Sequence, residues 1–400
     1  MRPRSRADFA VAIICALPLE VDAVEALFDE PYDRLGKFYG KQPGDANAYI
    51  NGRIGSHDIV LCYMPRMGKG SAASVASSLR VSYTGVQIAL VVGICGGVPY
   101  PSDGNDAEIF LGDLIISDAV VEYDFGRQYP SGFQRKMDGH KDMLGEPHRE
   151  IRTLLAGLKG NRTRNEFEGQ MSRQFYSMQQ LDARWRRPDG LKDILFEASY
   201  SHKHYIQNSA AMCRCFNGDS PDDICEEARE HSCDSLGCDR NQVRRCRGAD
   251  TTRVSLHIGK VASADTVMKS GEHRDQISRK EKVIGLKWKV PGHKNKKWQD
   301  YAAATAACGL KVFLEYYKIE KKTPLIEQDL QVSINHLNEQ SRTAVIFIFF
   351  AFLYFRGMLL TIHTRLTRLI TPWSELPAIL EDAHLRRFTI PLDTINSWEV

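Results

Sequence analysis

The sequence lacks a strong excess of charge of either sign. Its 53 lysines and arginines nearly balance 50 aspartates and glutamates, which leaves a formal net charge of +3 over 400 residues. So small an excess gives no electrostatic reason to bind nucleic acid or an anionic membrane surface, and most charges are expected on solvated faces. We therefore expect no nucleic-acid partner.

The sequence also lacks an uninterrupted apolar run of the length that crosses a bilayer, which is about 20 residues. Residues 344–355 are apolar, and Arg356 ends the run after these twelve. Continued through Arg356, the segment 344–362 is a marginal membrane segment, because a central arginine costs about 2.5–3.5 kcal/mol on insertion scales. Three alternatives stay open for the tail 319–400: membrane association through 344–362, an added buried helix, or disorder.

The N-terminus lacks the cleavage site of a secretory signal. A basic tail precedes the apolar stretch Phe9–Leu17, but Asp8 interrupts its start and no small-x-small site follows before Glu20. We interpret 9–17 as a first buried strand and expect a cytoplasmic chain. In that compartment the ten cysteines are expected to be mostly reduced thiols or metal ligands.

The cysteines are concentrated in one segment. Six of the ten lie between residues 213 and 246, with His202, His204 and His231 nearby, yet they form no paired CxxC array. Such a density in a reducing compartment favours a structural zinc site, while disulfides and loose thiols remain alternatives. The candidate metal ligands are Cys213, Cys215, Cys225, Cys233 and Cys238.

Apolar strand patterns alternate with helical patterns in two stretches of the chain. This alternation predicts an α/β fold with a mainly parallel central sheet flanked by helices. Residues 127–249 between the two stretches are polar and basic, and we interpret them as an insertion within a domain at 8–318. The predicted strands are 9–17, 87–98, 112–121, 254–263 and one from Val283, with a hairpin at 49–64 that turns at Asn51-Gly52, and the predicted helices start at Pro18 and cover 72–79, 270–282 and 294–317.

The strand at 87–98 is the centre of this pattern. Its apolar run ends in Gly93, Gly96 and Gly97, which is typical of a buried strand that enters a tight turn. Glycines there let a small polar ligand approach main-chain N–H groups. A buried strand followed by a glycine turn is also an ordinary structural feature, so the motif gains weight only from its neighbours.

Five short motifs stand in a fixed order along the chain. They are Ile13–Glu20, Met67–Gly70, Val92–Gly97, Gly112–Ser117 and Ala262–Thr266. In this order they resemble the nucleoside phosphorylase family, which includes purine and uridine phosphorylases and the methylthioadenosine/S-adenosylhomocysteine nucleosidases. The likeness covers 9–126 and 254–317 and is closest to a divergent fungal branch. Each motif is weak alone, and their order makes the likeness specific.

The resemblance implies cleavage of the N-glycosidic bond of a purine nucleoside, without a cofactor and commonly in a homo-oligomer. Glu20 matches a glutamate that positions water in the nucleosidases and an arginine that holds phosphate in bacterial purine phosphorylases. A carboxylate repels phosphate, and Val91 and Ile94 stand at two other phosphate-ligand positions, so the resemblance favours hydrolysis. Glu20 is equally interpretable as a carboxylate favoured by the helix dipole. The candidate ligand-binding residues are Gly68, Gly93, Ile94, Cys95, Gly96 and Asp265.

One part of the family pattern has no room in this chain. Seven residues separate Gly285 from His293, where a segment like the family's last helix begins, whereas a parallel crossover needs about a dozen or more. The family's ribose-binding glutamate and acidic aspartate come from that missing unit, and no Asp or Glu lies between Leu286 and Gln299. We therefore expect impaired catalysis.

Two alternatives to an impaired enzyme stay open. The chain is a pseudoenzyme candidate, meaning a non-catalytic sensor module that binds a nucleoside. The other alternative is that the sequence omits an exon after Gly285 and reads non-coding sequence after Glu320.

Overall fold

A computed structural model describes most of the chain up to residue 319 and one later strand. The chain divides into two units, 1–354 and 355–400, and the residues described here all lie in the first. The described residues are 2–102, 108–130, 132–135, 143–144, 147–188, 193–206, 214–217, 225, 228, 231, 233–247, 254–266, 268, 270–286, 297–319 and 344–348.

The first block of the central sheet is built around β1 (Val11–Cys15), all of whose residues are buried. Strand β1 pairs in parallel with β4 (His57–Tyr63) on one side and with β5 (Ile88–Val92) on the other. Strand β3 (Tyr49–Ile54) is antiparallel to β4, and β2 (Glu30–Arg34) is antiparallel to β3. The interior pairs are parallel and the outer ones antiparallel.

The second block is built around β13 (Leu256–Ser263). It pairs in parallel with β7 (Leu114–Glu122) and with β14 (Val283–Leu286). The short β6 (Gly96–Gly97) is antiparallel to β14, and β10 (Met143–Leu144) is antiparallel to β7. The sheet is therefore mixed, with a parallel interior in each block.

Strand β15 (Ala344–Ile348) lies between the two blocks. It is parallel to β5 over five residue pairs and meets β7 where Ile348 lies opposite Ile116. This outcome differs from all three alternatives for the tail over these five residues. Branched and aromatic side chains favour a strand, and the open position between β5 and β7 accepts one. The rest of 344–362 lies outside the described residues.

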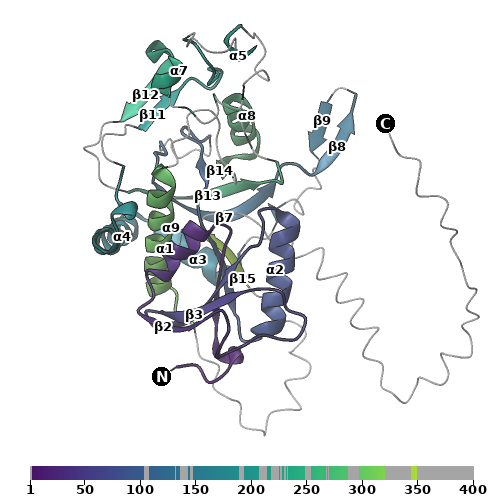
Figure 1. The fold of residues 1–400 in the computed structure, drawn as a ribbon, viewed down its shortest axis with the longest axis vertical. Coiled ribbons are helices and arrows are strands. Elements are labelled where there is room, and N and C mark those ends of the chain that lie inside the picture. The colour runs from purple at the N-terminus through teal and green to yellow at the C-terminus, as the bar shows by residue number, and fades with distance from the viewer. Residues whose placement is uncertain are drawn as a thin grey trace, which may run out of the picture. The chain divides into compact units, whose positions relative to one another are not determined.

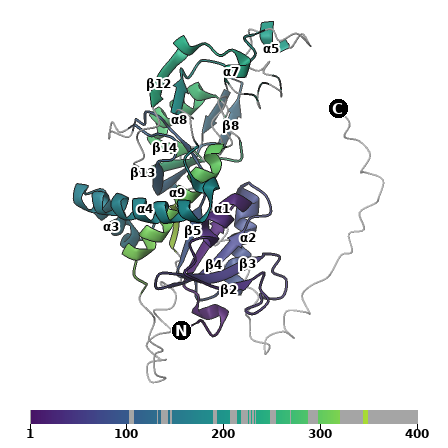
Figure 2. The ribbon, with the colours of Figure 1, turned by 60° about the vertical axis from the view of Figure 1, so that its left-hand side comes forward.

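Helices cover both faces of the sheet (Figures 1 and 2). Helices α1 (Pro18–Glu25) and α9 (Lys297–Tyr316) pack against each other on one face, while α2 (Lys69–Ser82) packs on β4 from the other. Helix α8 (Gly271–Glu281) lies within the predicted range 270–282 and packs on β14. Ser270 is its N-cap, because the Ser270 side chain accepts a hydrogen bond from the His273 N–H. The predicted α/β fold is confirmed as a mixed sheet flanked by helices.

The polar segment 127–249 does not behave as one piece. Helices α3 (Arg149–Leu158) and α4 (Asn161–Leu181) belong to the main body, because α4 packs on α9 and its Glu168 carboxylate accepts a hydrogen bond from the Leu256 N–H. The other described elements of the segment include two antiparallel strand pairs, β8 (Gly126–Tyr129) with β9 (Gly132–Arg135) and β11 (Asp193–Phe196) with β12 (Val243–Arg247). They also include the short helices α5 (Arg214–Asn217) and α7 (Cys233–Leu236) and 3-10 helices at Ala183–Trp185 and Arg240–Gln242. A further 3-10 helix, Arg6–Asp8, lies near the N-terminus.

The predicted hairpin is present, but its predicted turn is wrong. The chain reverses at Gly55, which has a φ of +59°, and not at Asn51-Gly52. Gly52 instead lies inside β3, where the Phe28 ring packs over it. A Cβ at this position would lie 2.2 Å from Phe28 Cδ2, so a larger residue would clash with the ring. The glycine is explained by close packing, which the Asn-Gly pattern does not reveal.

Among the described residues, no helix combines the length and the apolar character that crossing a bilayer requires.

Candidate functional site

Glu20 is buried at the start of α1, with 3% of its surface exposed. One carboxylate oxygen, Oε2, accepts hydrogen bonds of 2.9 Å from the backbone N–H groups of Ala16 and Leu17. The other, Oε1, accepts a 2.8 Å hydrogen bond from the N–H of Ile94. The carboxylate therefore links the turn after β1 to the turn after β5. Its position in the first turn of α1 also agrees with the interpretation of Glu20 as a carboxylate at a helix start.

Residues 93–97, which we call the glycine turn, are shaped around this carboxylate. A Cβ on Gly93 would lie 2.4 Å from Glu20 Oε1, which is closer than non-bonded atoms approach. Glycine at 93 is therefore required by the position of Glu20. The structure thus brings three of the predicted site residues, Glu20, Gly93 and Ile94, into one contact.

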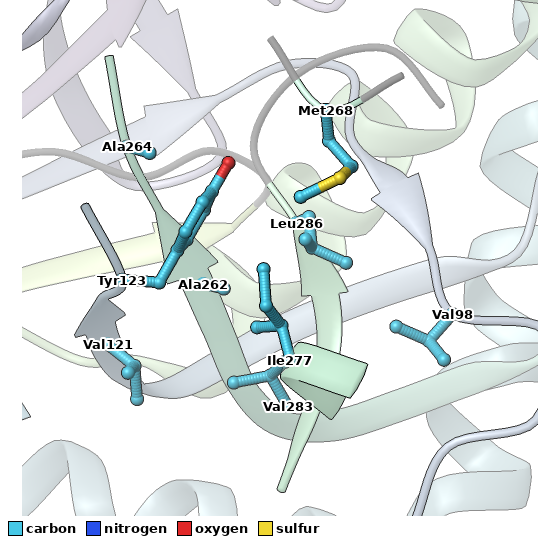
Figure 3. Packing of buried hydrophobic residues seen from close by; sticks show 9 residues of the cluster. All are labelled: Val98, Val121, Tyr123, Ala262, Ala264, Met268, Ile277, Val283 and Leu286. Atoms are coloured by element: carbon cyan, nitrogen blue, oxygen red, sulfur yellow. The ribbon is translucent and has the colours of Figure 1, made fainter. Parts of the chain in front are cut away.

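The far end of the glycine turn reaches the second block of the sheet. Gly97 pairs with Gly285 and Gly96 with Leu286, and the Val98 N–H donates a 2.9 Å hydrogen bond to the Ile284 carbonyl. Val98, directly after the glycine turn, belongs to an apolar cluster shown in Figure 3. The other members come from β7, β13, α8 and β14 and from the segments that follow β7 and β13. Its members are Val98, Val121, Tyr123, Ala262, Ala264, Met268, Ile277, Val283 and Leu286.

Cys95 lies within the glycine turn, and burial raises the pKa of its thiol. The neutral thiol is therefore the form present near pH 7. A neutral thiol is a weak nucleophile, so Cys95 is better suited to line the turn than to attack a substrate.

A second group of polar residues, which we call the charged cluster, consists of Lys69, Glu122, Asp124 and Asp265. Lys69 Nζ donates a 2.7 Å hydrogen bond to Asp124 and also bonds Glu122. Burial by itself lowers the pKa of Lys69, but the hydrogen bonds that its ammonium donates to Asp124 and Glu122 outweigh burial and raise that pKa. The lysine is therefore held in its charged form.

Asp265 places the third carboxylate of the charged cluster at the start of α2. Its Oδ1 accepts a 2.7 Å hydrogen bond from the Lys69 N–H, and its own N–H donates a 2.6 Å hydrogen bond to Asp124. Gly68 has a φ of +124°, and a Cβ there would lie 3.5 Å from Asp265 Oδ1. The structure thus brings the predicted residues Gly68 and Asp265 together, with Asp265 capping a helix.

Both groups connect the carboxyl ends of strands in the first block to the carboxyl ends of strands in the second. The glycine turn runs from the end of β5 to the end of β14, and Lys69, after β4, reaches the ends of β7 and β13. In α/β sheets, ligands bind outside the carboxyl ends of strands. This junction is therefore the candidate site.

Sequence reasoning missed Lys69, Glu122 and Asp124. Lys69 stands inside the Met67–Gly70 motif. Glu122 ends the strand that begins at Leu114 and Asp124 follows it, so their positions relative to the motifs carried the signal. The neighbouring Gly112-Asp113 motif has a structural role, because Asp113 accepts hydrogen bonds from the Phe110 and Ser255 N–H groups.

The predicted metal ligands that the structure describes fall into two groups. Cys215 and Cys225 lie together with His204, and Cys233 and Cys238 lie together with His202. The two histidines were noted in the sequence but not assigned as ligands. Cys213, the fifth predicted ligand, lies outside the described residues. The segment 287–296, which we expect to be too short for the family's acidic unit, also lies outside them.

Comparison with known proteins shows a likeness to one family over part of the chain. Residues 10–164 match the family model of the phosphorylase superfamily. A nucleotide-binding leucine-rich repeat (NLR)-like protein of Hyaloscypha variabilis is 26% identical over 332 residues, which is 77% of this chain and 29% of that protein. A 5'-methylthioadenosine/S-adenosylhomocysteine nucleosidase of Mycobacterium bovis is 26% identical over 131 residues, covering 32% of this chain and 44% of that protein.

Among solved structures, the chain is similar to the 5'-methylthioadenosine/S-adenosylhomocysteine nucleosidase of Helicobacter pylori. The TM-score is 0.40 at 12% identity, over 78% of this chain and 99% of that one. This chain spans less than half the length of the two curated relatives named above.

Proposed function

We propose that this chain, whose residues 10–164 match the family model of the phosphorylase superfamily, is a purine-nucleoside hydrolase of low activity. The substrate lies at the junction of the glycine turn and the charged cluster. Water attacks C1′ of the ribose, the N-glycosidic bond breaks, and the base leaves. Phosphate does not take part.

One observation carries this proposal. Carboxylates are hydrogen-bonded to the backbone N–H and the ammonium group of Lys69, which would otherwise be available to bind phosphate. A helix N-terminus and a lysine are common phosphate ligands. Here the Lys69 N–H at the start of α2 is bonded to Asp265, and its ammonium is bonded to Glu122 and Asp124. A phosphate dianion would meet three negative charges around one positive charge. Neutral water meets no such repulsion.

Glu20 is the residue we propose to orient the attacking water and to accept its proton. Backbone N–H groups from two turns hold the carboxylate in one orientation beside the glycine turn. A fixed orientation favours general-base catalysis, because the proton acceptor must lie within hydrogen-bond reach of the water.

Low activity follows from the missing acid. With no Asp or Glu between Leu286 and Gln299, the departing base has no carboxylic acid there to protonate it. General acid catalysis contributes typically about 10²–10⁴-fold, so turnover is expected to fall by about that factor.

The test is the release of adenine from adenosine and from 5'-methylthioadenosine by the full chain, followed by chromatography with and without phosphate. We expect slow release of free base and free sugar at a rate that does not depend on phosphate. Formation of a sugar 1-phosphate that increases with phosphate would contradict the proposal.

Glu20→Gln tests the role of the carboxylate. We expect loss of base release while nucleoside binding persists. The amide also gives up one acceptor oxygen near Ile94, so thermal unfolding must be measured alongside. Ser270→Ala, which removes the cap of α8 away from the site, is the matched control, because it destabilises by about 1 kcal/mol without touching a proposed ligand. If both variants lose activity in proportion to stability, Glu20 is only structural.

A second candidate function is nucleoside binding without turnover. The absence of carboxylates from 286–299 favours it, because binding needs the junction whereas cleavage also needs the acid. Isothermal titration with adenosine, combined with the release assay, separates the two functions. Saturable binding with no adenine formed over days would favour the sensor.

A further inference from the structure

The segment 193–247, which we call the Cys/His subdomain, gathers sulfur and imidazole groups at two points. In the first cluster, His202 Nδ1 lies 3.6 Å from Cys238 Sγ and 3.9 Å from Cys233 Sγ. In the second, His204 Nδ1 lies 3.1 Å from Cys215 Sγ and 3.6 Å from Cys225 Sγ, and the two sulfurs are 3.6 Å apart. Within each cluster the three ligand atoms all lie within 4.8 Å of one another.

These separations match the edges of a zinc tetrahedron. With Zn–S bonds of about 2.3 Å and Zn–N bonds of about 2.1 Å, tetrahedral geometry places two sulfurs about 3.8 Å apart and a sulfur about 3.6 Å from a nitrogen. Four of these five separations lie within 0.3 Å of these values, and the His204–Cys215 distance of 3.1 Å is shorter. A disulfide is not the alternative here, because disulfide sulfurs lie about 2.05 Å apart and none of these four cysteines is disulfide-bonded.

The hydrogen bonds around the first cluster orient His202 as a ligand. Its Nε2 lies 3.1 Å from the His231 carbonyl oxygen, which can only accept, so Nε2 carries the proton. In the neutral ring, Nδ1 then presents its lone pair toward Cys233 and Cys238. Metal-bound histidines characteristically donate their second N–H to a carbonyl or carboxylate in this way.

A backbone donor serves the second cluster. The Ala228 N–H donates a 3.3 Å hydrogen bond to Cys225 Sγ. The sulfur is therefore an acceptor, which suits a thiolate ligand stabilised by its surroundings.

The apolar core of the Cys/His subdomain is small. It consists of Phe196, Cys215, Ala228, Leu236 and Cys238, with partly buried neighbours that include two more cysteines of the clusters. Segments of this size seldom stabilise themselves by apolar burial alone and often depend on a metal. The elements of this subdomain, α5, α7, β11 and β12, gather together in Figures 1 and 2.

We propose that the Cys/His subdomain binds two structural zinc ions, one held by His202, Cys233 and Cys238 and the other by His204, Cys215 and Cys225. Each set supplies three of the four ligands that tetrahedral zinc takes. Two thiolates and one imidazole favour zinc over calcium and magnesium, which take oxygen ligands, and iron–sulfur clusters bind mainly through four cysteines.

The two ligand sets are nested along the chain. His202 and the pair Cys233 and Cys238 enclose the whole second set, so the first ion closes a long loop and the second ion closes a shorter loop inside it. Closing loops restricts the unfolded chain, so both ions stabilise the subdomain beyond their direct bonds. Binding at one site should therefore favour binding at the other.

The test is the zinc content of the full chain, purified under reducing conditions without chelator and measured by mass spectrometry of the metal. We expect two zinc ions per chain, one in Cys238→Ser, one in Cys215→Ser, and none in the double variant. Cys308→Ala is the matched control, because Cys308 is a buried free cysteine of α9 outside both clusters, and it should keep two ions.

Cobalt exchange on the wild-type chain gives a second readout if a variant does not fold. Tetrahedral cobalt bound to thiolates should show visible d–d absorption and a sulfur-to-metal charge-transfer band, with two equivalents bound. Three outcomes would overturn the proposal: less than one metal ion per chain without these bands, a single ion per chain, or zinc content that Cys215→Ser and Cys238→Ser leave unchanged. None of these outcomes depends on nucleoside cleavage, so they do not bear on the proposed hydrolase.

Discussion

The glycine-turn junction and the Cys/His subdomain both gather polar side chains in buried surroundings, but the partners of those side chains differ. At the junction, Glu20 accepts hydrogen bonds from backbone N–H groups, and Lys69 pairs with the acids around it. In the subdomain, imidazole nitrogens and sulfurs face one another at 3.1–3.9 Å. At the junction, charged side chains pair with other groups of the protein. In the subdomain, thiol and imidazole groups are arranged as the ligands of a metal ion.

The two regions differ in what stabilises them. The junction lies on the large sheet, whose apolar strands supply the stability that holds polar groups in place. The subdomain has few large apolar side chains, so its fold depends more on its Cys and His residues. Metal removal, deletion of β15 and substitutions at the junction should separate the two regions, with effects that decrease in that order.

Metal removal should have the largest effect and should be confined to one region. Treatment with a strong chelator should expose 193–247 to proteolysis and hydrogen exchange while the sheet stays protected. Structural zinc contributes about 10–16 kcal/mol of binding free energy in zinc-finger peptides, so its loss outweighs the small core. Hydrogen exchange followed by mass spectrometry measures this region by region. Equal loss of protection in β1 and β13 would remove the distinction between the two regions.

Deletion of residues 344–348 tests how much β15 contributes to the stability of the large sheet. We expect the free energy of unfolding to fall by about 5 kcal/mol, at about 1 kcal/mol for each of the five residues paired with β5. Denaturant titration of the full chain and of the deletion variant measures the difference. Replacing the five residues by a polar Gly-Ser segment of equal length is the control for chain continuity. An unchanged midpoint would show that the two blocks do not need β15.

Gly93→Ala should destabilise the junction by about 3 kcal/mol and weaken nucleoside binding. The new Cβ would meet Glu20 Oε1 at 2.4 Å, so the buried carboxylate must move away from its donors, and overpacking typically costs 1–3 kcal/mol, about the top of that range here. Thermal unfolding and titration with adenosine check both effects.

Gly157→Ala is the matched control for this substitution. No atom lies within 4 Å of the position of its Cβ, and it stands in α3, so alanine should stabilise the chain by about 0.4–1 kcal/mol. If Gly93→Ala behaves like this control, Glu20 does not require a glycine beside it.

Lys69→Met should cost about 2 kcal/mol, because it leaves Glu122 and Asp124 close together without their shared cation. The loss is smaller than for a fully buried ion pair, since the Lys69 side chain keeps 16% exposure. A second substitution, Glu122→Gln, should restore part of it. If Lys69→Met is neutral, the charged cluster does not hold α2 to the second block.

The same cluster predicts a pH dependence. The pKa of Lys69 is raised in the folded chain, so its stabilising effect is full below the pKa of an unfolded lysine, about 10.4, and is lost as the pH rises through the folded value. The stability difference between wild type and Lys69→Met should therefore be constant from pH 7 to about 9 and shrink above about 10.4. Urea unfolding at a series of pH values measures it. A difference that grows at high pH would have the wrong sign.

Much of the fold could be predicted from local pattern. The alternation of apolar strands and amphipathic helices identified β1, β5, β7, β13, β14 and their helices, and Pro18 and Ser270 marked helix starts. The turn at Asn51-Gly52 failed because a glycine pattern does not say whether the glycine makes a turn or accommodates a ring such as Phe28. The strand at 344–348 was not predicted, because the sequence of a tail segment gives no sign of which distant strands it will pair with.

The candidate site was predictable only in part. The ordered motifs pointed to Glu20, Gly68, Gly93 and Asp265, since each follows a strand at its carboxyl end. Lys69, Glu122 and Asp124 were missed, because their role depends on β4, β7 and β13 meeting at one place. For the same reason the cysteine spacing predicted a metal site without dividing its ligands between His202 and His204.

Local sequence pattern was enough to indicate most of the strands and helices, their order, the family resemblance and the density of cysteine. These depend on neighbours along the chain, where period and spacing are directly visible. The tertiary structure decided which carboxylate faces which donor, which glycine is required by a side chain, and which cysteine lies beside which histidine. Those contacts join residues far apart in sequence, and their geometry is set by the packing of whole strands and helices.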